Sequence, residues 1–172
     1  ARTASALPGR TIIALIETVK GFMALRQLAS LPGVRRIAFG SVDFGTETGI
    51  SDVGDGMTFI RTQIVLESCH AGLLPPIDGV SVDFRDTGVM QRDAQRSRQL
   101  GFGGKLCIHP NQVAAVNAAY LPTAEEVDWA RRVLTAIEAS AGGATAVDGK
   151  MVDKPVVEQA RRILASATSD SE

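Results

Sequence analysis

Two acidic residues follow short apolar runs and lie 26 positions apart in the chain. Glu17 follows the run at 14–16, and Asp43 ends the run at 39–43. Such runs predict buried strands of a parallel sheet, and the apolar spacing of 19–30 predicts a helix between them. In a strand–helix–strand unit both strands end at one edge of the sheet, so the two carboxylates are expected side by side. Neighbouring carboxylates repel unless a cation separates them, which makes this a candidate Mg²⁺ site. Two solvated carboxylates at strand ends are the alternative that the spacing leaves open.

The same strand-and-helix rhythm continues along the chain. Two further strands are predicted at 77–84 and 105–110. Further helices are predicted at 57–71, 87–100, 111–120, 123–139 and 155–167, the 123–139 helix beginning with a capping box from Thr123 to Glu126. The chain therefore holds four βα units and a helical appendage, which places a domain boundary between residues 121 and 122. Residues 141–150 are rich in Gly and Ala, and we expect them to form a mobile hinge.

Four parallel strands cannot close a barrel by themselves. Three architectures remain: a small open α/β sheet, a half-barrel completed by another copy, and a piece of an eight-unit barrel. We expect the four strands to be parallel, adjacent and in chain order, with helices on one outer face. An antiparallel pair among them, or helices on both faces of the sheet, would refute the barrel. The first residues, 1–10, read as a loop entered from elsewhere, so we expect the chain to begin inside a larger fold.

The composition excludes several classes of protein. The 172 residues carry a net charge of −1, which gives no overall field to attract nucleic acid or an anionic membrane. No apolar stretch approaches the roughly 20 residues of a membrane span. Cys69 and Cys107 form no Cys-x-x-Cys pair, so a reducing compartment is favoured and a cytoplasmic location is expected.

Other motifs carry less chemistry. The glycine-rich stretch 101–106 has Leu106 where a phosphate-binding loop needs Ser or Thr, and it precedes a strand rather than a helix. His70 lies within a predicted helix and is interpreted as structural. His109 ends a predicted strand at the same sheet edge as Glu17 and Asp43, but its position alone favours a structural role.

Several segments together resemble the citrate lyase β-subunit-like family, the HpcH/HpaI aldolase group that includes malyl-CoA and citramalyl-CoA lyases. The segments that carry the resemblance are 14–18 (ALIET), 39–43 (FGSVD), 76–80 (PIDGV), 101–113 (GFGGKLCIHPNQV), 129–133 (WARRV) and 148–156 (DGKMVDKPV). The resemblance implies a (β/α)₈ TIM-type barrel of the pyruvate/phosphoenolpyruvate aldolase group. This chain would then hold its last four βα units in 1–121 and a helical C-terminal extension in 122–172.

The resemblance also implies roles for three residues. Glu17 and Asp43 match the two protein ligands of the family's Mg²⁺ ion. Asp153 matches an acid–base carboxylate that the extension inserts into the active site of a neighbouring subunit, which implies a homo-oligomer, a trimer or hexamer. Without the resemblance, Asp153 would be interpreted as the cap of the helix that Pro155 begins. The arginine that grips the substrate carboxylate in this family belongs to units that the chain lacks, and no CoA-binding residue is assigned.

The expected function is a Mg²⁺-dependent carbon–carbon lyase that cleaves or forms a β-hydroxyacyl-CoA thioester, such as citryl-, malyl- or citramalyl-CoA. A small acyl-CoA or oxo acid would be its substrate, with neither nucleic acid nor membrane as a partner. The alternatives are a metal-dependent aldolase acting on free hydroxy-keto acids, a malyl-CoA thioesterase, and a non-catalytic half-barrel that serves as an assembly module. The sequence does not select among the acyl groups.

Overall fold

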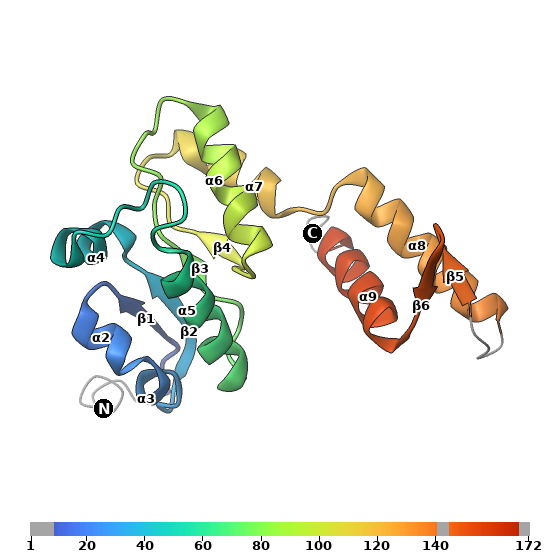
Figure 1. Ribbon diagram of the computed structural model, residues 1–172, viewed down its shortest axis with the longest axis horizontal. Helices are drawn as coiled ribbons and strands as arrows, with labels where there is room; N and C mark the ends of the chain where they lie inside the picture. The colour runs from blue at the N-terminus through green and yellow to red at the C-terminus, as the bar shows by residue number, and fades with distance from the viewer. Residues whose placement is uncertain (1–8, 141–144, 169–172) are drawn as a thin grey trace. The chain divides into compact units, whose positions relative to one another are not determined.

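The computed structural model describes residues 9–140 and 145–168 of the chain. It divides into two units, Ala1–Tyr120 and Leu121–Glu172, each of which is described by itself. The first unit contains a four-stranded sheet with helices, and the second contains a hairpin with two helices (Figure 1). No helix of the described residues is both long and apolar enough to cross a bilayer.

The sheet of the first unit is parallel throughout, and its strands follow chain order. It consists of β1 (Ile12–Ile16), β2 (Val34–Phe39), β3 (Ile77–Asp78) and β4 (Gly104–Lys105). The prediction of four adjacent parallel strands in chain order is therefore confirmed. All four strands end at one edge of the sheet, the edge at which parallel α/β folds place their sites.

The last two strands are shorter than the predicted 77–84 and 105–110. Backbone N–H groups that would pair with a neighbouring strand in a longer sheet donate to side chains instead. The Gly79 N–H donates to the Asp78 carboxylate at 2.8 Å, and the chain leaves the sheet there. After β4, the N–H groups of Ile108 and His109 donate to Oε1 of Gln112, at 2.7 and 3.1 Å. A buried glutamine thus satisfies backbone donors that sequence patterns assign to a neighbouring strand.

Six helices of the described residues accompany this sheet. They are α2 (Val19–Met23), α3 (Leu25–Ala29), α4 (Ser41–Thr48), α5 (Thr58–His70), α6 (Thr87–Gln99) and α7 (Asn111–Tyr120). The helix predicted at 19–30 is in fact two short helices that meet at Ala24. The Ala24 N–H donates to the carbonyls of both Lys20 and Gly21, at 3.2 Å each. The helix predicted at 87–100 is confirmed, with Asp86 accepting hydrogen bonds from the Gly88 and Val89 N–H groups.

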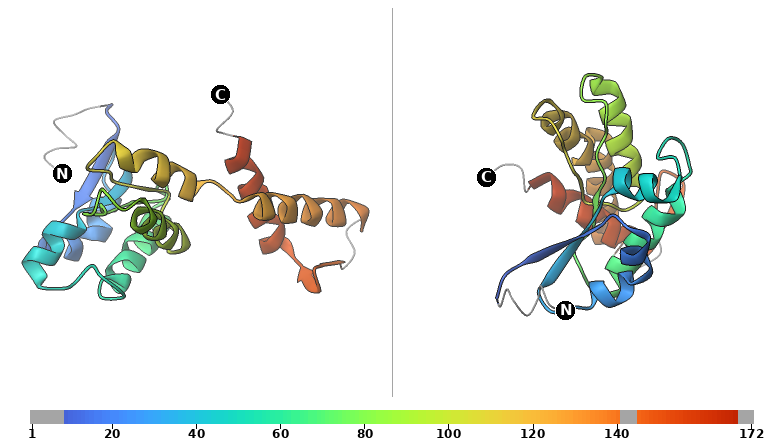
Figure 2. Two further views of the ribbon diagram at one scale, coloured as in Figure 1. Left: turned by 90° about the horizontal axis from the view of Figure 1, so that it is seen from above. Right: turned by 90° about the vertical axis from the view of Figure 1, so that its left-hand side faces the viewer.

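Helix α4 corrects the prediction that Asp43 ends a strand. Strand β2 stops at Phe39, Gly40 is the residue that caps α4, and Asp43 lies in the first helical turn. The ring of Phe44 is buried and packs edge-on against Phe22 and Phe39, at centroid distances of 5.8 and 5.6 Å. This aromatic packing anchors the helix directly after the strand. Figure 2 shows α4 following β2 in the backbone trace.

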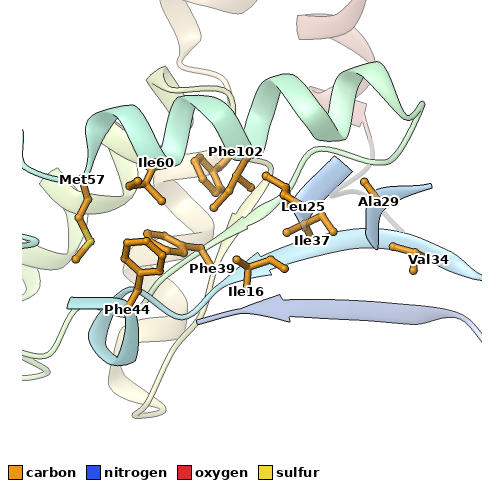
Figure 3. Close-up of a cluster of buried hydrophobic side chains, with 11 residues drawn as sticks. Ile16, Leu25, Ala29, Val34, Ile37, Phe39, Phe44, Met57, Ile60 and Phe102 are labelled. Carbon is orange, nitrogen blue, oxygen red and sulfur yellow. The ribbon is translucent and has the colours of Figure 1, made fainter. Parts of the chain in front are cut away.

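The hydrophobic core lies between α5 and the first two strands, as Figure 3 shows. Ile16, Ile37 and Phe39 from the strands and Ile64 from α5 are each at most 1% exposed. Burial of such side chains is the main favourable term in folding. The other face of β1 is open in this chain, since Ile13 and Leu15 remain 54% and 50% exposed.

The second unit is a pair of helices with a β-hairpin. It consists of α8 (Ala124–Ala139), β5 (Thr145–Val147), β6 (Lys150–Val152) and α9 (Lys154–Thr168). The predicted capping box is present, with the Glu126 N–H donating to Thr123 and the Thr123 N–H donating to Glu126. The small core of this unit joins both helices to the hairpin through Ala130, Val133, Val152 and Ala160.

The hinge predicted at 141–150 is wrong for its second half. Residues 141–144 lie outside the described residues, while 145–150 form strands and a tight turn. Asp148 and Gly149 have φ angles of 51° and 74°, as a two-residue hairpin turn requires. The Arg132 guanidinium of α8 donates to the Asp148 carboxylate at 2.8 Å and so fastens the turn to the helix.

Candidate active site

Two strand ends bring Glu17 and the chain that leads to Asp43 into close contact. The Gly40 N–H donates to the Ile16 carbonyl at 2.8 Å, which extends the pairing of β1 and β2 to the edge of the sheet. A Cβ atom added at Gly40 would lie only 2.5 Å from Cβ of Glu17. The absence of a side chain at position 40 therefore lets Glu17 approach the first turn of α4.

Glu17 and Asp43 line the same pocket, which has a volume of about 370 Å³. Glu17 is half-buried and Asp43 is exposed. Among the described residues, no lysine or arginine forms an ion pair with either carboxylate. The sequence prediction placed Asp43 at the correct edge of the sheet, but it assigned the residue to the end of a strand instead of the first turn of a helix.

This pair of carboxylates fits a magnesium ion better than a metal enclosed wholly by protein. Within the described residues, no group of three or more His, Cys, Asp or Glu side chains could hold a metal. A closed structural zinc site would need such a group, whereas Mg²⁺ is typically bound by one or two carboxylates together with water and substrate oxygens. Glu17 and Asp43 are therefore the residues that could hold Mg²⁺ in this pocket.

The beginning of α4 adds positive partial charge beside the two carboxylates. Its N-cap is Gly40, which has no side chain to accept from the first helical N–H groups. The N–H groups of residues 41–43 precede the first intrahelical donor, Phe44, which bonds to Gly40 at 3.0 Å. Free N–H groups at a helix N-terminus favour an anion, so this edge of the pocket suits a substrate carboxylate.

A buried ion network, which sequence reasoning missed, lies behind the pocket. The Arg61 guanidinium of α5 donates to Asp78 at 2.8 Å and to both oxygens of Asp52, and it lies 5.4 Å from the centre of the Phe39 ring. Burial raises the pKa of Asp52, but the hydrogen bond and charge of Arg61 outweigh burial and leave that pKa lowered. The sequence signal was an arginine within the apolar face of α5, directly after buried Ile60.

Lys105 belongs to this network and not to the pocket that holds the two carboxylates. Its Nζ donates to the Gly79 carbonyl at 2.6 Å and lies 3.9 Å from the Asp78 carboxylate. Burial lowers its pKa, the nearby Asp78 charge opposing that shift. Lys105 lines a separate polar cavity of about 40 Å³, together with Asp78 and Arg61.

His109 does not line the pocket, although its neighbour Ile108 does. Its Nδ1 accepts from the Asn111 N–H at 3.1 Å, and its ring stacks on Phe84 with the centroids 4.9 Å apart. Both contacts agree with the structural interpretation of this histidine. His70 is the last residue of α5 and is exposed.

Asp153 lies in the second unit, directly after β6. Its Oδ1 accepts from the Val156 N–H at 3.1 Å, so the carboxylate caps α9. Its geometry is that of the helix cap which the sequence also suggested.

Comparison with known protein families identifies the chain. Residues 7–110, more than half of the chain, match the family model described as HpcH/HpaI aldolase/citrate lyase. The chain belongs to the HpcH/HpaI aldolase/citrate lyase family. Residues 61–170 also match a model described as C-C bond lyase of the TIM-barrel fold. The resemblance drawn from the sequence motifs is thereby confirmed.

Relatives within this family include lyases from bacteria and mammals. A citrate lyase subunit beta-like protein of Mycobacterium tuberculosis is 34% identical over 168 residues, covering 94% of this chain and 61% of that protein. The mitochondrial citramalyl-CoA lyase of Rattus norvegicus is 35% identical over 141 residues, covering 79% of this chain and 41% of the lyase. The chain thus spans about half the length of these relatives.

A solved structure supports the fold. The crystal structure of protein CitE from Mycobacterium tuberculosis, in complex with magnesium, acetoacetate and coenzyme A, matches with a TM-score of 0.83 and 34% identity. The match covers 94% of this chain and 62% of that protein. The fold class is therefore α/β, with relatives of the TIM-barrel type.

Proposed function

We propose that this chain is part of a Mg²⁺-dependent carbon–carbon lyase that cleaves or forms a β-hydroxyacyl-CoA thioester. The observation that carries the proposal is the convergence of Glu17 and Asp43 on one pocket in a chain of this family. The Mycobacterium tuberculosis protein binds magnesium, acetoacetate and coenzyme A, and the rat relative is a citramalyl-CoA lyase. These relatives favour a thioester substrate over a free hydroxy-keto acid. Cys69 and Cys107 are free thiols, which suits the expected cytoplasmic location.

We infer that the four strands form half of an eight-stranded TIM-type barrel. Ile13 and Leu15 expose half of their surfaces on the open face of β1, where the interior of a barrel would bury them. The relatives are considerably longer than this chain, which allows for further βα units in the complete protein. In this proposal those units close the barrel and complete the substrate pocket.

Within the pocket, Glu17 and Asp43 would hold the Mg²⁺ ion. The bound ion supplies Lewis-acid polarisation of the oxo oxygen of the substrate. The free N–H groups of residues 41–43 bind the substrate carboxylate beside it. Apolar side chains line most of the remaining pocket wall, and in the closed barrel they would keep water from the reacting carbon atoms.

The reaction requires one group that moves a proton, and we assign this role to Asp153. In the cleavage direction its carboxylate accepts the proton of the β-hydroxyl group. The carbon–carbon bond then breaks, a carbonyl forms at the former hydroxyl carbon, and the electron pair passes to the carbon next to the thioester, which takes up a proton. General acid–base catalysis of this kind contributes about 100-fold or more to the rate. In this proposal Asp153 comes from a neighbouring copy, so the working enzyme is a homo-oligomer.

The test measures cleavage of citryl-, malyl- and citramalyl-CoA by the complete protein, together with Mg²⁺ binding by calorimetry. Asp43→Asn keeps the shape of the side chain but removes a negative charge, so Mg²⁺ affinity and turnover should both fall at least tenfold. Asp55→Asn is the matched control, because the Asp55 side chain is 98% exposed and lies outside the pocket. Unchanged Mg²⁺ affinity in Asp43→Asn would refute the metal site.

The same assays separate the alternative functions. Release of free CoA without carbon–carbon cleavage would identify a thioesterase. Activity on free hydroxy-keto acids alone would identify an aldolase. Absence of all three activities would favour an assembly module.

A further inference from the structure

Two loop segments supply part of the active-site pocket, and both lie beyond the ends of their strands. Val82 follows β3, Ile108 follows β4, and each lines the pocket. The backbone pairing of these strands reaches as far as Leu106, whose N–H donates to the Asp78 carbonyl at 2.9 Å. Val82 and Ile108 lie past this bond, so the sheet itself does not fix the distance between the segments that carry them.

The side chain of Gln112, on α7, joins the two segments. Its Oε1 accepts from the N–H groups of Ile108 and His109 at 2.7 and 3.1 Å, and its Nε2 donates to the Ser81 carbonyl at 2.7 Å. The carbonyl oxygen of the amide thus meets two donors and its NH₂ group meets an acceptor, which permits only this orientation of the amide. Gln112 is 1% exposed, so water does not compete for these bonds.

Helix capping explains only one of the three bonds. A glutamine in the first turn of a helix commonly accepts from the backbone N–H three residues before it, and the bond from His109 fits this local pattern. The bonds to Ile108 and Ser81 lie outside it, and Ser81 is 31 positions away in the chain. Gln112 therefore does more than begin α7.

The segment after β3 is also held from its other side. The Ser81 hydroxyl group donates to Oδ2 of Asp93 on α6 at 2.6 Å, and Ser81 is 5% exposed. A few residues further on, the Phe84 ring stacks on the His109 ring. This part of the pocket wall is thus fastened between α6 and α7, and Gln112 supplies its buried link to the segment after β4.

We propose that Gln112 is a positioning residue of the active site, which sets the distance between the segments that carry Val82 and Ile108. This inference rests on the proposed lyase function for its effect on catalysis, while the bonds themselves lie within this chain. Displacement of a pocket wall by about 1 Å can cost about 100-fold in rate. Glu17 and Asp43 follow β1 and β2, whereas the bonds of Gln112 go to the segments after β3 and β4. Mg²⁺ binding should therefore not depend on Gln112.

The variant Gln112→Glu tests this role in the complete protein. An ionised carboxylate keeps the shape of the side chain and still accepts from Ile108 and His109, but it cannot donate to the Ser81 carbonyl. We expect kcat/KM for the best substrate among citryl-, malyl- and citramalyl-CoA to fall at least tenfold, with unchanged Mg²⁺ affinity in calorimetry. Asn117→Asp is the matched control, because it makes the same chemical change at an exposed position of α7. Equal losses in the two variants, or a loss of Mg²⁺ affinity in Gln112→Glu, would overturn the inference.

The pH profile of Gln112→Glu separates positioning from a general disruption of the fold. When the introduced carboxyl group is protonated, its O–H can again donate to the Ser81 carbonyl. Burial raises the pKa of a carboxyl group, so kcat/KM of the variant relative to the native protein should recover as the pH is lowered from about 8 to about 6. Neighbouring ionisable groups, among them Asp93 and His109, are present in both proteins, so the ratio removes their contribution. A ratio that stays constant with pH would contradict the proposed bond.

Hydrogen exchange followed by mass spectrometry gives a readout that needs no activity. In the native protein the amides of Ile108 and His109 should exchange slowly although they lie outside a strand, and fast exchange there would overturn the inference even if the variant fails to fold. In Gln112→Glu, exchange should become faster in 79–84 while Ile108 and His109 stay protected. If the native protein cleaves no thioester, the lyase proposal fails, and the exchange pattern still decides whether Gln112 holds the two segments together.

Discussion

At the scale of single residues, two glycines determine how closely the strand ends around the pocket approach one another. A Cβ atom at Gly40 would lie 2.5 Å from Cβ of Glu17, and one at Gly79 would lie 2.2 Å from the Ser41 hydroxyl oxygen. These contacts join the ends of β1, β2 and β3 around the pocket. The sequence indicated that Glu17 and Asp43 would meet, but the close approach depends on backbone positions that no residue pattern encodes.

Replacing Gly40 with alanine should damage the site through one methyl group. The added Cβ must displace Glu17, so we expect a loss of about 1–3 kcal/mol in the free energy of unfolding, together with weaker Mg²⁺ binding. Denaturant titration and calorimetry measure the two effects. Gly104→Ala is the control, because a Cβ at that position has no atom within 4 Å. Equal behaviour of the two variants would contradict the close approach.

At the scale of elements, Arg61 joins three segments behind the pocket. It connects α5 to the loop that contains Asp52, to the end of β3 at Asp78, and to the Phe39 ring at the end of β2. Asp78 is 2% exposed, so it depends on this arginine and on the Gly79 N–H for its hydrogen bonds. The network holds the pocket wall through buried charges.

Removing this arginine should therefore destabilise the protein strongly. Arg61→Met leaves the Asp78 carboxylate buried without its main partner, and we expect a loss of about 3–5 kcal/mol in the free energy of unfolding. Lys154→Met provides the comparison, since Lys154 also pairs with a carboxylate, that of Glu158, but both side chains are largely exposed, at 87% and 55%. We expect at most about 1 kcal/mol there. Urea unfolding of both variants makes the measurement, and similar losses would argue against a buried network.

Sequence patterns predicted elements best where local signals were strong. The capping box at Thr123 placed the start of α8 correctly, and the helix predicted from residue 87 begins there as α6. Helix α4 was missed because its stability comes from the packing of Phe44 on rings distant in sequence, and 77–84 was assigned as strand although Asp78 and Gly79 end it. Arg61 was missed for the same reason: its partners are set by tertiary structure.

At the scale of the whole molecule, the stability of the fold should depend on pH through Tyr120. Its hydroxyl group donates to the Gly104 carbonyl at 2.8 Å, and burial raises its pKa from 10.0 to about 12. Between these values the unfolded chain has lost the proton that the folded chain keeps, so the free energy of unfolding should fall as the pH rises from about 10 to about 12.

The variant Tyr120→Phe should lose this dependence. We expect it to be about 1 kcal/mol less stable at neutral pH, because a hydrogen bond is lost. The difference from the native protein should shrink above pH 10. Buried Lys105 contributes an opposite slope, since its lowered pKa makes the folded state gain stability as the pH rises, but this is common to both proteins. Urea unfolding at several pH values measures the difference, and a constant difference would contradict the assignment.

The proposed oligomer makes a separate prediction about Asp153. Asp153→Ala should abolish turnover in the complete protein but leave Mg²⁺ binding unchanged, because the residue is not a proposed metal ligand. Mixed oligomers of Asp153→Ala and Asp43→Asn subunits should regain part of the activity, since some sites then combine an intact metal site with an intact acid–base group. Failure to recover activity in verified mixed oligomers would place the acid–base group in the same chain as the metal.

The cap that Asp153 forms on α9 has a mechanical consequence for a residue proposed to carry a proton. The Val156 N–H donates to Oδ1 of Asp153, and this hydrogen bond is strongest while the carboxylate is negatively charged. Each time the carboxylate takes up a proton, that acceptor weakens and the first turn of α9 loses part of its anchor. In the proposed reaction the start of this helix would thus loosen and tighten once per turnover, in step with the chemistry.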